Sequence, residues 1–223
     1  LSGSVTGNID VTTTPVVING DVSGTLDLVG FSSSATAGLQ INGDITSSGT
    51  VIARRNVKPY VRVYGDIAGT LDIRKDVGSS ESRELYCEGD VSGTLKIDGN
   101  SYVFTGVDID GSVTGLVWIV KALRSGDHGG YVRVLRSLGS AGDAGEIQID
   151  GGLSSPNAPL QAYVSINHDG YGRQHLPDLD LWHDGSTVKL GSTTYTGPND
   201  TARVHLAPPT CGKGDCDGNG AVD

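Results

Sequence analysis

A glycine-rich motif recurs along much of the chain and restricts its fold more than any other feature. It reads Gly, Asp or Ser, Val or Ile, a small residue and Gly, and an apolar segment follows it. Copies begin at Gly3, Gly20, Gly43, Gly65, Gly89 and Gly111, and a weaker copy, I-D-G-G-L, surrounds Gly151. The steps between the opening glycines are 17, 23, 22, 24, 22 and 40 residues, so the last step equals two repeats or one repeat with an insertion. Such a period is typical of stacked-repeat proteins.

Within each repeat the apolar residues alternate with other residues, as in the series Ile18, Val22, Leu26 and Leu28. A period of two indicates strands, and we expect the flanking glycines to adopt positive φ at sharp turns. Three short strands fit in one repeat, and stacked repeats cover each other's apolar faces. The sequence therefore predicts an all-β fold, a single-stranded parallel β-helix over residues 1–206. We expect it to be right-handed, with about 7–9 coils of roughly 22 residues.

Composition and charge exclude several classes of function. The net charge of −10 repels phosphate and anionic lipid, so a nucleic-acid partner is not expected. No apolar run approaches the length of about 18 residues that a membrane span needs. Because the chain begins at Leu1 and contains no methionine, we expect either a processed form from which a signal peptide has been removed or the ordered part of a longer chain.

The repeats resemble the right-handed β-helix proteins of bacterial secreted and surface families, and also the short rungs of bactofilin-like solenoids. The resemblance covers roughly residues 1–166. It implies a β-helix architecture but no single activity, because such scaffolds carry lyases, hydrolases, adhesins and filament proteins.

An aspartate follows the opening glycine in four copies of the motif, at Asp21, Asp44, Asp66 and Asp90. If these carboxylates stack at one corner, they could bind cations such as Ca²⁺. Alternatively, each caps its own turn, which the serines at the equivalent positions 4 and 112 favour, since serine is a poor Ca²⁺ ligand.

The three cysteines invite different interpretations. We expect Cys87 to be a small core residue. Cys211 and Cys216 are close enough to form a disulfide in a tight loop, which would suit an oxidising compartment. The alternative is that all three are free thiols.

The repeat register is lost from Asn167 onward. This segment contains three histidines and three aspartates that either ligate a transition metal or belong to a polar loop before the strand D-L-D-L-W: His168, Asp169, His175, Asp178, Asp180 and His183. Two later segments, S-T-V-K-L-G-S-T-T-Y-T-G and A-R-V-H-L, are predicted strands. We expect them to form the last rungs or a hairpin that covers the C-terminal end of the core.

After a predicted linker over residues 207–213, residues 214–223 read G-D-C-D-G-N-G-A-V-D. Asp215, Asp217, Asn219 and Asp223 match positions 1, 3, 5 and 9 of a Ca²⁺ loop, and Gly220 matches the glycine at position 6. This tail resembles the start of a type I dockerin, which implies Ca²⁺ as the cofactor and a cohesin-like partner. The acidic residue expected at position 12 would lie beyond Asp223. The alternative is a Gly/Asp-rich tail without affinity for Ca²⁺.

Candidate residues for glycan cleavage are also present. Asp108 and Asp110 are two residues apart, so both point to one face of a strand and could form an acid/base pair. Other candidates are Asp98 as an acid, Lys96, Arg74 and Lys75 as bases, and Tyr60, Tyr64, Tyr86, Trp118 and Trp182 as sugar-stacking aromatics. We expect Tyr64 and Tyr86, 22 residues apart, to stack on each other instead.

We favour a structural function. No Ser/His/Asp or Cys/His nucleophile motif and no phosphate loop is visible in the sequence. The first repeat has no capping helix before it, and an uncapped β-helix end exposes unpaired backbone groups. The sequence thus predicts an extracellular structural or surface protein, a homo-oligomer that stacks end to end into a fibre or coat. The alternatives are a polysaccharide lyase or glycoside hydrolase, and a passive adhesin or carbohydrate-binding module.

Overall fold

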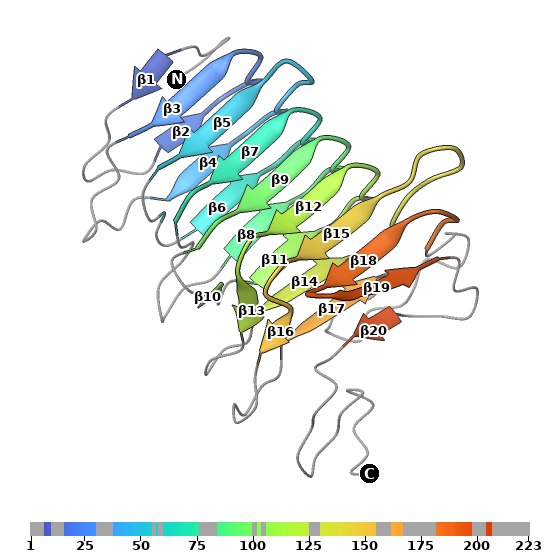
Figure 1. The fold of residues 1–223 in the computed structure, drawn as a ribbon. Coiled ribbons are helices and arrows are strands. Elements are labelled where there is room, and N and C mark those ends of the chain that lie inside the picture. The colour runs from blue at the N-terminus through green and yellow to red at the C-terminus, as the bar shows by residue number, and fades with distance from the viewer. Residues whose placement is uncertain are drawn as a thin grey trace.

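The protein is an elongated stack of β-strands in the computed structural model (Figure 1). The structure describes residues 7–9, 16–29, 38–54, 57, 60–75, 84–99, 102–103, 106–124, 130–154, 162–166, 182–197 and 204–206, and no helix occurs among them. It confirms the predicted all-β parallel β-helix. In particular, the described residues hold no helix of the length and apolarity that crossing a membrane would require.

Two long sheets form opposite sides of the rod. The nine-stranded sheet follows the order β1 (Gly7–Ile9), β3 (Thr25–Leu28), β5 (Thr50–Ala53), β7 (Thr70–Ile73), β9 (Thr94–Ile97), β12 (Leu116–Ile119), β15 (Glu146–Ile149), β18 (Thr187–Leu190) and β19 (Thr193–Thr196). The eight-stranded sheet follows the order β2 (Val16–Ile18), β4 (Leu39–Ile41), β6 (Tyr60–Val63), β8 (Glu84–Cys87), β11 (Gly106–Ile109), β14 (Tyr131–Val134), β17 (Tyr163–Ile166) and β20 (Val204–Leu206).

A three-stranded sheet occupies the third side near the C-terminal end of the rod, with β10 (Tyr102–Val103), β13 (Ala122–Arg124) and β16 (Leu153–Ser154). All neighbouring strands are parallel except the last pair of each long sheet, β18–β19 and β17–β20. Each long sheet therefore ends on an antiparallel strand.

The core lies between the two long sheets and consists of stacked aliphatic side chains. One inward row on the nine-stranded sheet runs through the paired positions Leu26, Val51, Leu71, Leu95, Val117, Ile147 and Val188, all fully buried. Each such side chain contributes about 1.5–3 kcal/mol by leaving water. Successive members of the row are 20 to 41 residues apart, so roughly 22 residues describes the central coils, and the later coils are longer.

The glycine motif forms the corner between the two long sheets. Its central Val or Ile points inward, and the corners pair in parallel through Val22, Ile45, Ile67, Val91, Val113, Leu138 and Trp182. Adjacent corners pass so close that a β-carbon on Gly65 would lie 2.7 Å from the backbone of Gly43. At these corners Gly20 has a positive φ, but glycines such as Gly65 and Gly93 do not, so the prediction of positive φ is wrong for them. Glycine is needed there because the backbone of the adjacent coil leaves no room for a β-carbon.

The aspartates of the motif link one coil to the next. The backbone N–H of Asp44 donates to Oδ1 of Asp21 at 2.9 Å, and the same bond repeats from Asp66 to Asp44, from Asp90 to Asp66 and from Ser112 to Asp90. These carboxylates therefore cap the N–H of the following coil. The expectation that each carboxylate caps its own turn is wrong, because its partner is the backbone N–H of the next coil. One oxygen of each carboxylate is therefore already hydrogen-bonded.

The weak copy around Gly151 does not form a corner between the two long sheets. The corner after Val113 is formed by Ser137 and Leu138, and Ser137 donates its hydroxyl to Ser112 Oγ at 3.0 Å in the place of an aspartate. Gly151 and Gly152 instead follow β15 and lead to β16. The 40-residue step therefore ends at a different part of the coil from the one where it begins.

The C-terminal end of the nine-stranded sheet is a hairpin, but both of its strands come from residues 186–197, which were predicted as one strand. The second predicted strand forms β20 and pairs with β17 in the other long sheet, so the two predicted segments do not form a hairpin with each other. β18 and β19 are joined at Gly191, which has a φ of +59°. Trp182 is 5% exposed, covers the last corner and donates its indole N–H to the carbonyl of Ser186 at 2.8 Å. Cys87 is a buried core residue, as predicted, and burial raises the pKa of its thiol to about 12.

Candidate functional site

The outer face of the eight-stranded sheet carries five of the eight tyrosines of the chain: Tyr60, Tyr64, Tyr86, Tyr131 and Tyr163. We call this surface the tyrosine face. Tyr60, Tyr131 and Tyr163 are the first residues of their strands. This position faces outward because the next residue, such as Val61 or Val132, is buried in the core. Tyr64 is the most exposed of the five, at 40%.

Two of these rings lie flat over glycines of the preceding coil. A β-carbon built on Gly38 would lie 2.7, 2.8 and 2.9 Å from three consecutive ring atoms of Tyr60. Such nearly equal distances place that position over the face of the ring rather than beyond its edge. A β-carbon on Gly106 would likewise meet Cζ, the hydroxyl oxygen and Cε1 of Tyr131. Since the missing β-carbons would point out of the sheet, both rings lie against its surface.

An ion pair locks the second of these rings in place. Arg133 donates from Nε to Oδ1 of Asp108 at 2.6 Å and from Nη2 to the hydroxyl of Tyr131 at 2.8 Å. The Tyr131 hydroxyl donates in turn to Oδ2 of Asp108 at 2.9 Å. The guanidinium carbon lies 4.1 Å from the centre of the Tyr131 ring, and the Arg133 side chain is only 7% exposed. Tyr163 stacks on Tyr131 with the ring centres 5.4 Å apart.

The other predicted carboxylate, Asp110, has a different partner. It accepts the hydroxyl of Tyr86 at 2.7 Å. Burial, together with this hydrogen bond, raises the pKa of Tyr86. Tyr86 also meets Tyr64 with the ring centres 6.1 Å apart and the planes at 69°. The predicted contact between these tyrosines is present, but as an edge-to-face pair, and the strand register pairs Tyr86 with Arg62 rather than with Tyr64.

Asp108 and Asp110 thus share a face, as predicted, yet each is bound to a different neighbouring coil. Asp108 is paired with a cation and a phenol, and Asp110 accepts a phenol hydroxyl. A general acid and base must be placed to exchange protons with a substrate. The geometry instead assigns these two carboxylates to holding the tyrosine face together.

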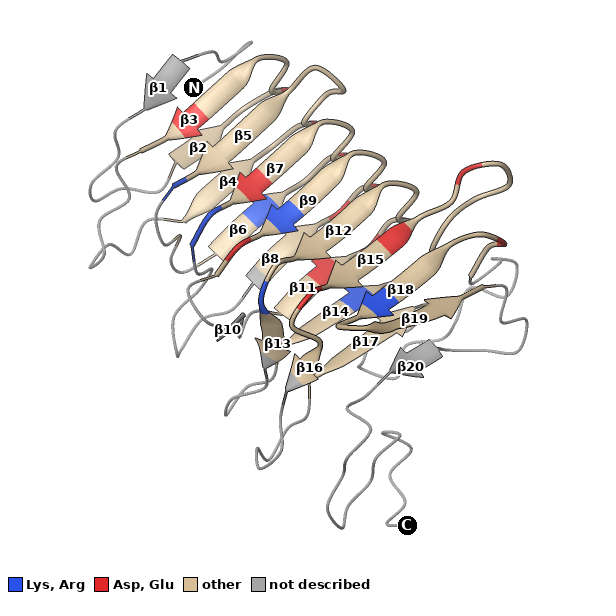
Figure 2. Cartoon of the chain, viewed as in Figure 1, with Lys and Arg blue, Asp and Glu red and all other residues tan. Residues whose placement is uncertain are grey.

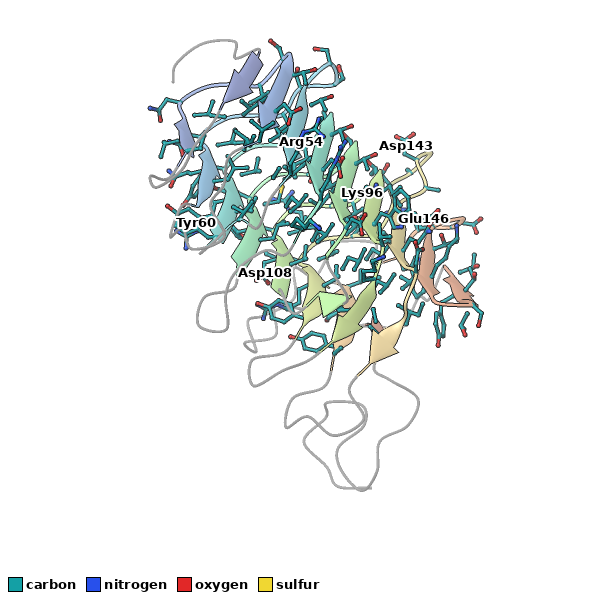
Figure 3. The ribbon with its side chains drawn as sticks, turned by 60° about the vertical axis from the view of Figure 1, so that its left-hand side comes forward. Arg54, Tyr60, Lys96, Asp108, Asp143 and Glu146 are labelled. Atoms are coloured by element: carbon teal, nitrogen blue, oxygen red, sulfur yellow. The ribbon has the colours of Figure 1, made fainter. Side chains whose placement is uncertain are left out.

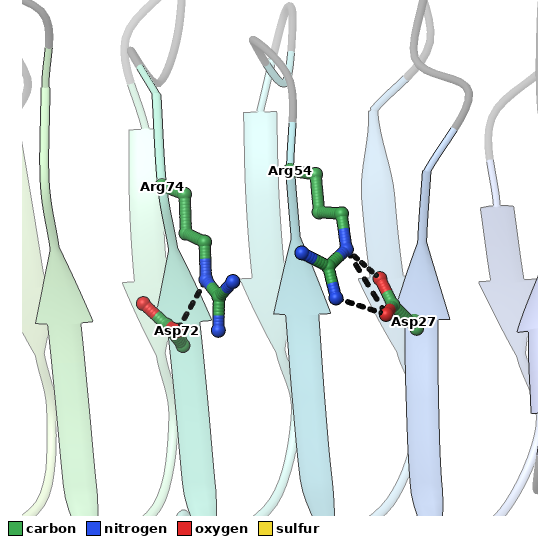
Figure 4. Close-up of polar contacts among 4 residues, drawn as sticks. All are labelled: Asp27, Arg54, Asp72 and Arg74. Atoms are coloured by element: carbon green, nitrogen blue, oxygen red, sulfur yellow. Dashed lines mark hydrogen bonds and ion pairs between the residues drawn. The ribbon is translucent and has the colours of Figure 1, made fainter.

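The nine-stranded sheet carries residues of both charge signs (Figure 2). Arg54 binds Asp27 of the preceding coil, with Nε 2.7 Å from Oδ1 and Nη2 2.6 Å from Oδ2 (Figure 4). Arg74, which follows β7, binds Asp72 of its own coil through Nε at 2.7 Å. Oδ1 of Asp72 is buried without a hydrogen-bond partner. Arg74 is therefore held in an ion pair rather than presented as a base.

The remaining candidates on this sheet also have partners. The Lys96 ammonium lies 4.7 Å from the ring centre of Trp118, whose indole N–H donates to Asp150 at 2.9 Å. Lys121 lies 3.9 Å from Asp98, and Lys75, beyond the end of β7, is exposed. The structure does not bring Asp98, Lys96, Arg74 and Lys75 together with Asp108 and Asp110, which lie on the other long sheet (Figure 3).

The ion pair at Asp27 predicts a specific acid sensitivity. The hydrogen bond from Arg54 holds the pKa of Asp27 below its ordinary value of 3.8. A carboxyl with a lowered pKa in the folded state stabilises the protein above pH 3.8, and this contribution is lost as the pH falls through the folded pKa. The difference in unfolding free energy between wild type and Asp27→Asn, measured by urea denaturation, should shrink as the pH falls below 3.8. A difference that stays constant into strong acid would contradict the assignment.

Of the remaining predicted sites, the structure contradicts one at Trp182, and the others lie largely outside the described residues. Trp182 is buried, so it cannot stack on a sugar, and the backbone N–H of His183 donates to the Leu138 carbonyl. The other five members of the His/Asp segment lie outside the described residues, as do Cys211, Cys216 and the proposed Ca²⁺ ligands Asp215, Asp217, Asn219 and Asp223. Within the described ranges no group of three or more His, Cys, Asp or Glu side chains could hold a metal ion.

The sequence interpretation missed the most regular element of the tyrosine face. The tetrapeptide Tyr-Val-Arg-Val occurs twice, as residues 60–63 and 131–134, and the tyrosine of each copy lies over a glycine of the preceding coil, Gly38 just before β4 and Gly106 at the start of β11. The repeated tetrapeptide was a visible signal. Its pairing with Gly38 and Gly106 required the strand register.

No family model matches the chain, and comparisons with curated proteins and with solved structures give no significant match.

Proposed function

We propose that the protein is an extracellular structural rod that associates end to end into a fibre or coat. The single observation that carries the proposal is an open backbone edge at each end of the nine-stranded sheet. In the part of the chain that the structure describes, no strand pairs with the outer edge of β1 or β19. Unpaired edges are templates for pairing with another chain.

The strand directions at the two ends are compatible with such pairing. β19 and β20 run antiparallel to their neighbours, whereas β1 and β2 run parallel to theirs. If a second copy stacks head to tail, β1 of that copy lies antiparallel to β19. The nine-stranded sheet then continues across the junction by antiparallel pairing, the more stable of the two kinds per residue. A head-to-tail contact that does not close produces a filament.

A substitution on the open edge tests this proposal. In the β18–β19 hairpin Leu190 is paired with Thr193 across a two-residue loop. The backbone groups of Thr194 then point away from β18, because hydrogen-bonded and non-hydrogen-bonded pairs alternate. A lysine at Thr194 blunts the edge by placing a charge there. We expect Thr194→Lys to lower the mean filament length in electron microscopy and the sedimentation coefficient at high protein concentration.

Thr94→Lys is the matched control, because Thr94 lies on β9, whose two edges are both paired. This control should assemble like wild type. A wild-type protein that stays a monomer at high concentration in the presence of Ca²⁺, or two lysine variants that assemble equally well, would refute end-to-end association.

The structural role is favoured over glycan cleavage because the candidate carboxylates are held in pairs with Arg133, Tyr86 and Lys121. The proposal extends to the C-terminal tail, where oxygen ligands at every second residue support a Ca²⁺ loop and a cohesin-like partner. Extracellular localisation belongs to the same proposal.

A further inference from the structure

The two outermost strands of the nine-stranded sheet, β1 and β19, carry complementary residues at the two ends of one inward row of the core (Figure 1). At the C-terminal end Tyr195 is paired with the buried Val188, so it lies on the same face and extends the row. Its side chain is 38% exposed. At the N-terminal end Gly7 is paired with Leu26 and begins the row. The row therefore starts with a residue that has no side chain and ends with an exposed aromatic ring.

The backbone of β1 presents Asn8 at its outer edge. Within the sheet, the carbonyl of Leu28 accepts from the N–H of Arg54 at 3.1 Å, and the corresponding carbonyl of each later coil up to β15 accepts from the next coil in the same way. Ile9 is in register with Leu28. Because the backbone groups of consecutive residues in a strand point to opposite sides, the N–H and C=O of Asn8 point away from β3.

The backbone of β19 presents Thr194 and Thr196 at the opposite outer edge. Gly197 donates its N–H to the carbonyl of Ser186 at 3.0 Å, on the side where β18 lies. By the same alternation, the backbone groups of the two threonines point away from β18. The strand reads Thr-Thr-Tyr-Thr, so it carries neither the charges nor the proline that commonly protect an edge from pairing.

These features match when a second copy follows head to tail in the register that the stack already uses. Continuing the inward row places Gly7 of the second copy opposite Tyr195, and its Asn8 then lies opposite Thr194. Asn8 and Thr194 both direct their N–H and C=O toward the junction, so they can form a hydrogen-bonded antiparallel pair. Tyr195 and Gly7 form the neighbouring non-hydrogen-bonded pair, in which opposed residues come closest.

A tyrosine opposite a glycine already occurs twice inside the rod. Tyr131 is paired with Gly106, and Tyr60 lies over Gly38, and in both cases the ring fills the space that a β-carbon would take. A ring that covers a glycine on the neighbouring strand stabilises the pairing of the two strands. The inward row of a head-to-tail junction contains the same combination.

We propose that the junction between two copies of this chain is formed by β19 of one copy and β1 of the next, with Thr194 opposite Asn8 and the ring of Tyr195 covering Gly7. This inference rests on the end-to-end association proposed above and specifies which residues meet. The occupant of the β19 edge is a second copy, because its β1 provides both the outward backbone groups and the glycine opposite the ring.

Disulfide trapping tests this register. Asn8→Cys and Thr194→Cys are combined in a background that carries Cys211→Ser and Cys216→Ser, and the assembled protein is mildly oxidised and run on a non-reducing gel. Opposed residues of a hydrogen-bonded pair have Cα atoms about 5.5 Å apart, a separation that a disulfide spans. The two positions lie at opposite ends of the sheet, so a disulfide between them joins two copies. We expect a ladder of covalent oligomers.

The matched control combines Asn8→Cys with Thr196→Cys, which displaces one thiol by two residues, or roughly 7 Å along the strand. This pair is too far apart to form a disulfide in the proposed register, so it should give no ladder. Filaments in which the control pair cross-links instead, in which neither pair does, or in which Asn8→Cys alone gives dimers would refute this junction but leave end-to-end association standing. A protein that forms neither filaments nor cross-links would refute both proposals.

The role of the ring is tested separately. Tyr195→Ala should raise the protein concentration at which filaments appear about tenfold or more, as expected when an aromatic anchor of an interface is truncated. Tyr195→Phe keeps the ring and should assemble close to wild type. Tyr64→Ala, which removes a tyrosine of similar exposure, 40%, from the tyrosine face, should also assemble like wild type. Filament formation by Tyr195→Ala at the wild-type concentration would show that the ring does not cover the junction.

Discussion

Replacing Gly93 by alanine is expected to destabilise the protein by more than about 4 kcal/mol, enough to unfold most domains of ordinary stability. A β-carbon on Gly93 would lie 2.0 Å from the carbonyl oxygen of Gly69 and 2.5 Å from that of Ala68. The backbone cannot move aside cheaply, because Gly93 donates to the Ile67 carbonyl and accepts from Leu116, each at 2.8 Å. Any shift that makes room therefore breaks the ladder between coils.

Gly185→Ala is the matched control, because the nearest atom to its β-carbon would be 3.8 Å away and only its φ of +79° is unfavourable. A left-handed conformation costs alanine roughly 1–2 kcal/mol. Guanidinium denaturation of both variants, followed by tryptophan fluorescence, separates the two effects. Equal destabilisation by the two substitutions would show that contact with the adjacent coil is not what excludes a side chain at Gly93.

Removing the carboxylate of Asp108 should also be severely destabilising, by about 3–5 kcal/mol for Asp108→Ala. The substitution leaves the guanidinium of Arg133, 7% exposed, without its anionic partner. It also removes the acceptor of the Tyr131 hydroxyl. The measurement is the free energy of unfolding from urea denaturation, with near-ultraviolet circular dichroism to report on the packing of Tyr131.

A double variant tests whether the lost stability comes from the unpaired charge of Arg133. Asp108→Ala combined with Arg133→Met removes both charges, so it should be more stable than Asp108→Ala alone. A double variant at least as unstable as the single one would show that the loss comes from packing and not from an uncompensated charge. A fully stable Asp108→Ala protein that had lost a glycan-cleaving activity would instead support the acid/base interpretation.

The fold was largely predictable because its determinants are local. Alternation in segments such as Thr94–Ile97 distinguishes inward from outward residues without any knowledge of neighbouring coils. The motif repeats marked most of the corners, and those at Leu138, which carries Arg136 and Ser137 in place of Gly and Asp, and at Trp182 were missed. The inward rows of the core follow directly from these two signals.

The candidate site was less predictable, because it depends on which residues of different coils lie side by side. Tyr64 and Tyr86 are one average repeat apart, yet the strand register pairs Tyr86 with Arg62. Asp27 and Asp72 occupy equivalent positions, but Asp27 is bound by an arginine of the next coil and Asp72 by an arginine of its own coil. Repeat spacing alone does not distinguish these arrangements when the coils differ in length.

The amino-acid sequence by itself determined that the chain stacks as a parallel β-helix and which side chains enter its core, since both follow from short-range patterns of apolar residues and glycine. Only the tertiary structure decided that Tyr60 and Tyr131 lie flat over Gly38 and Gly106, and that Asp108 holds Arg133. The physical reason is that lateral contacts in a solenoid join residues separated by a whole coil, and the variable lengths of the loops decide which residues meet.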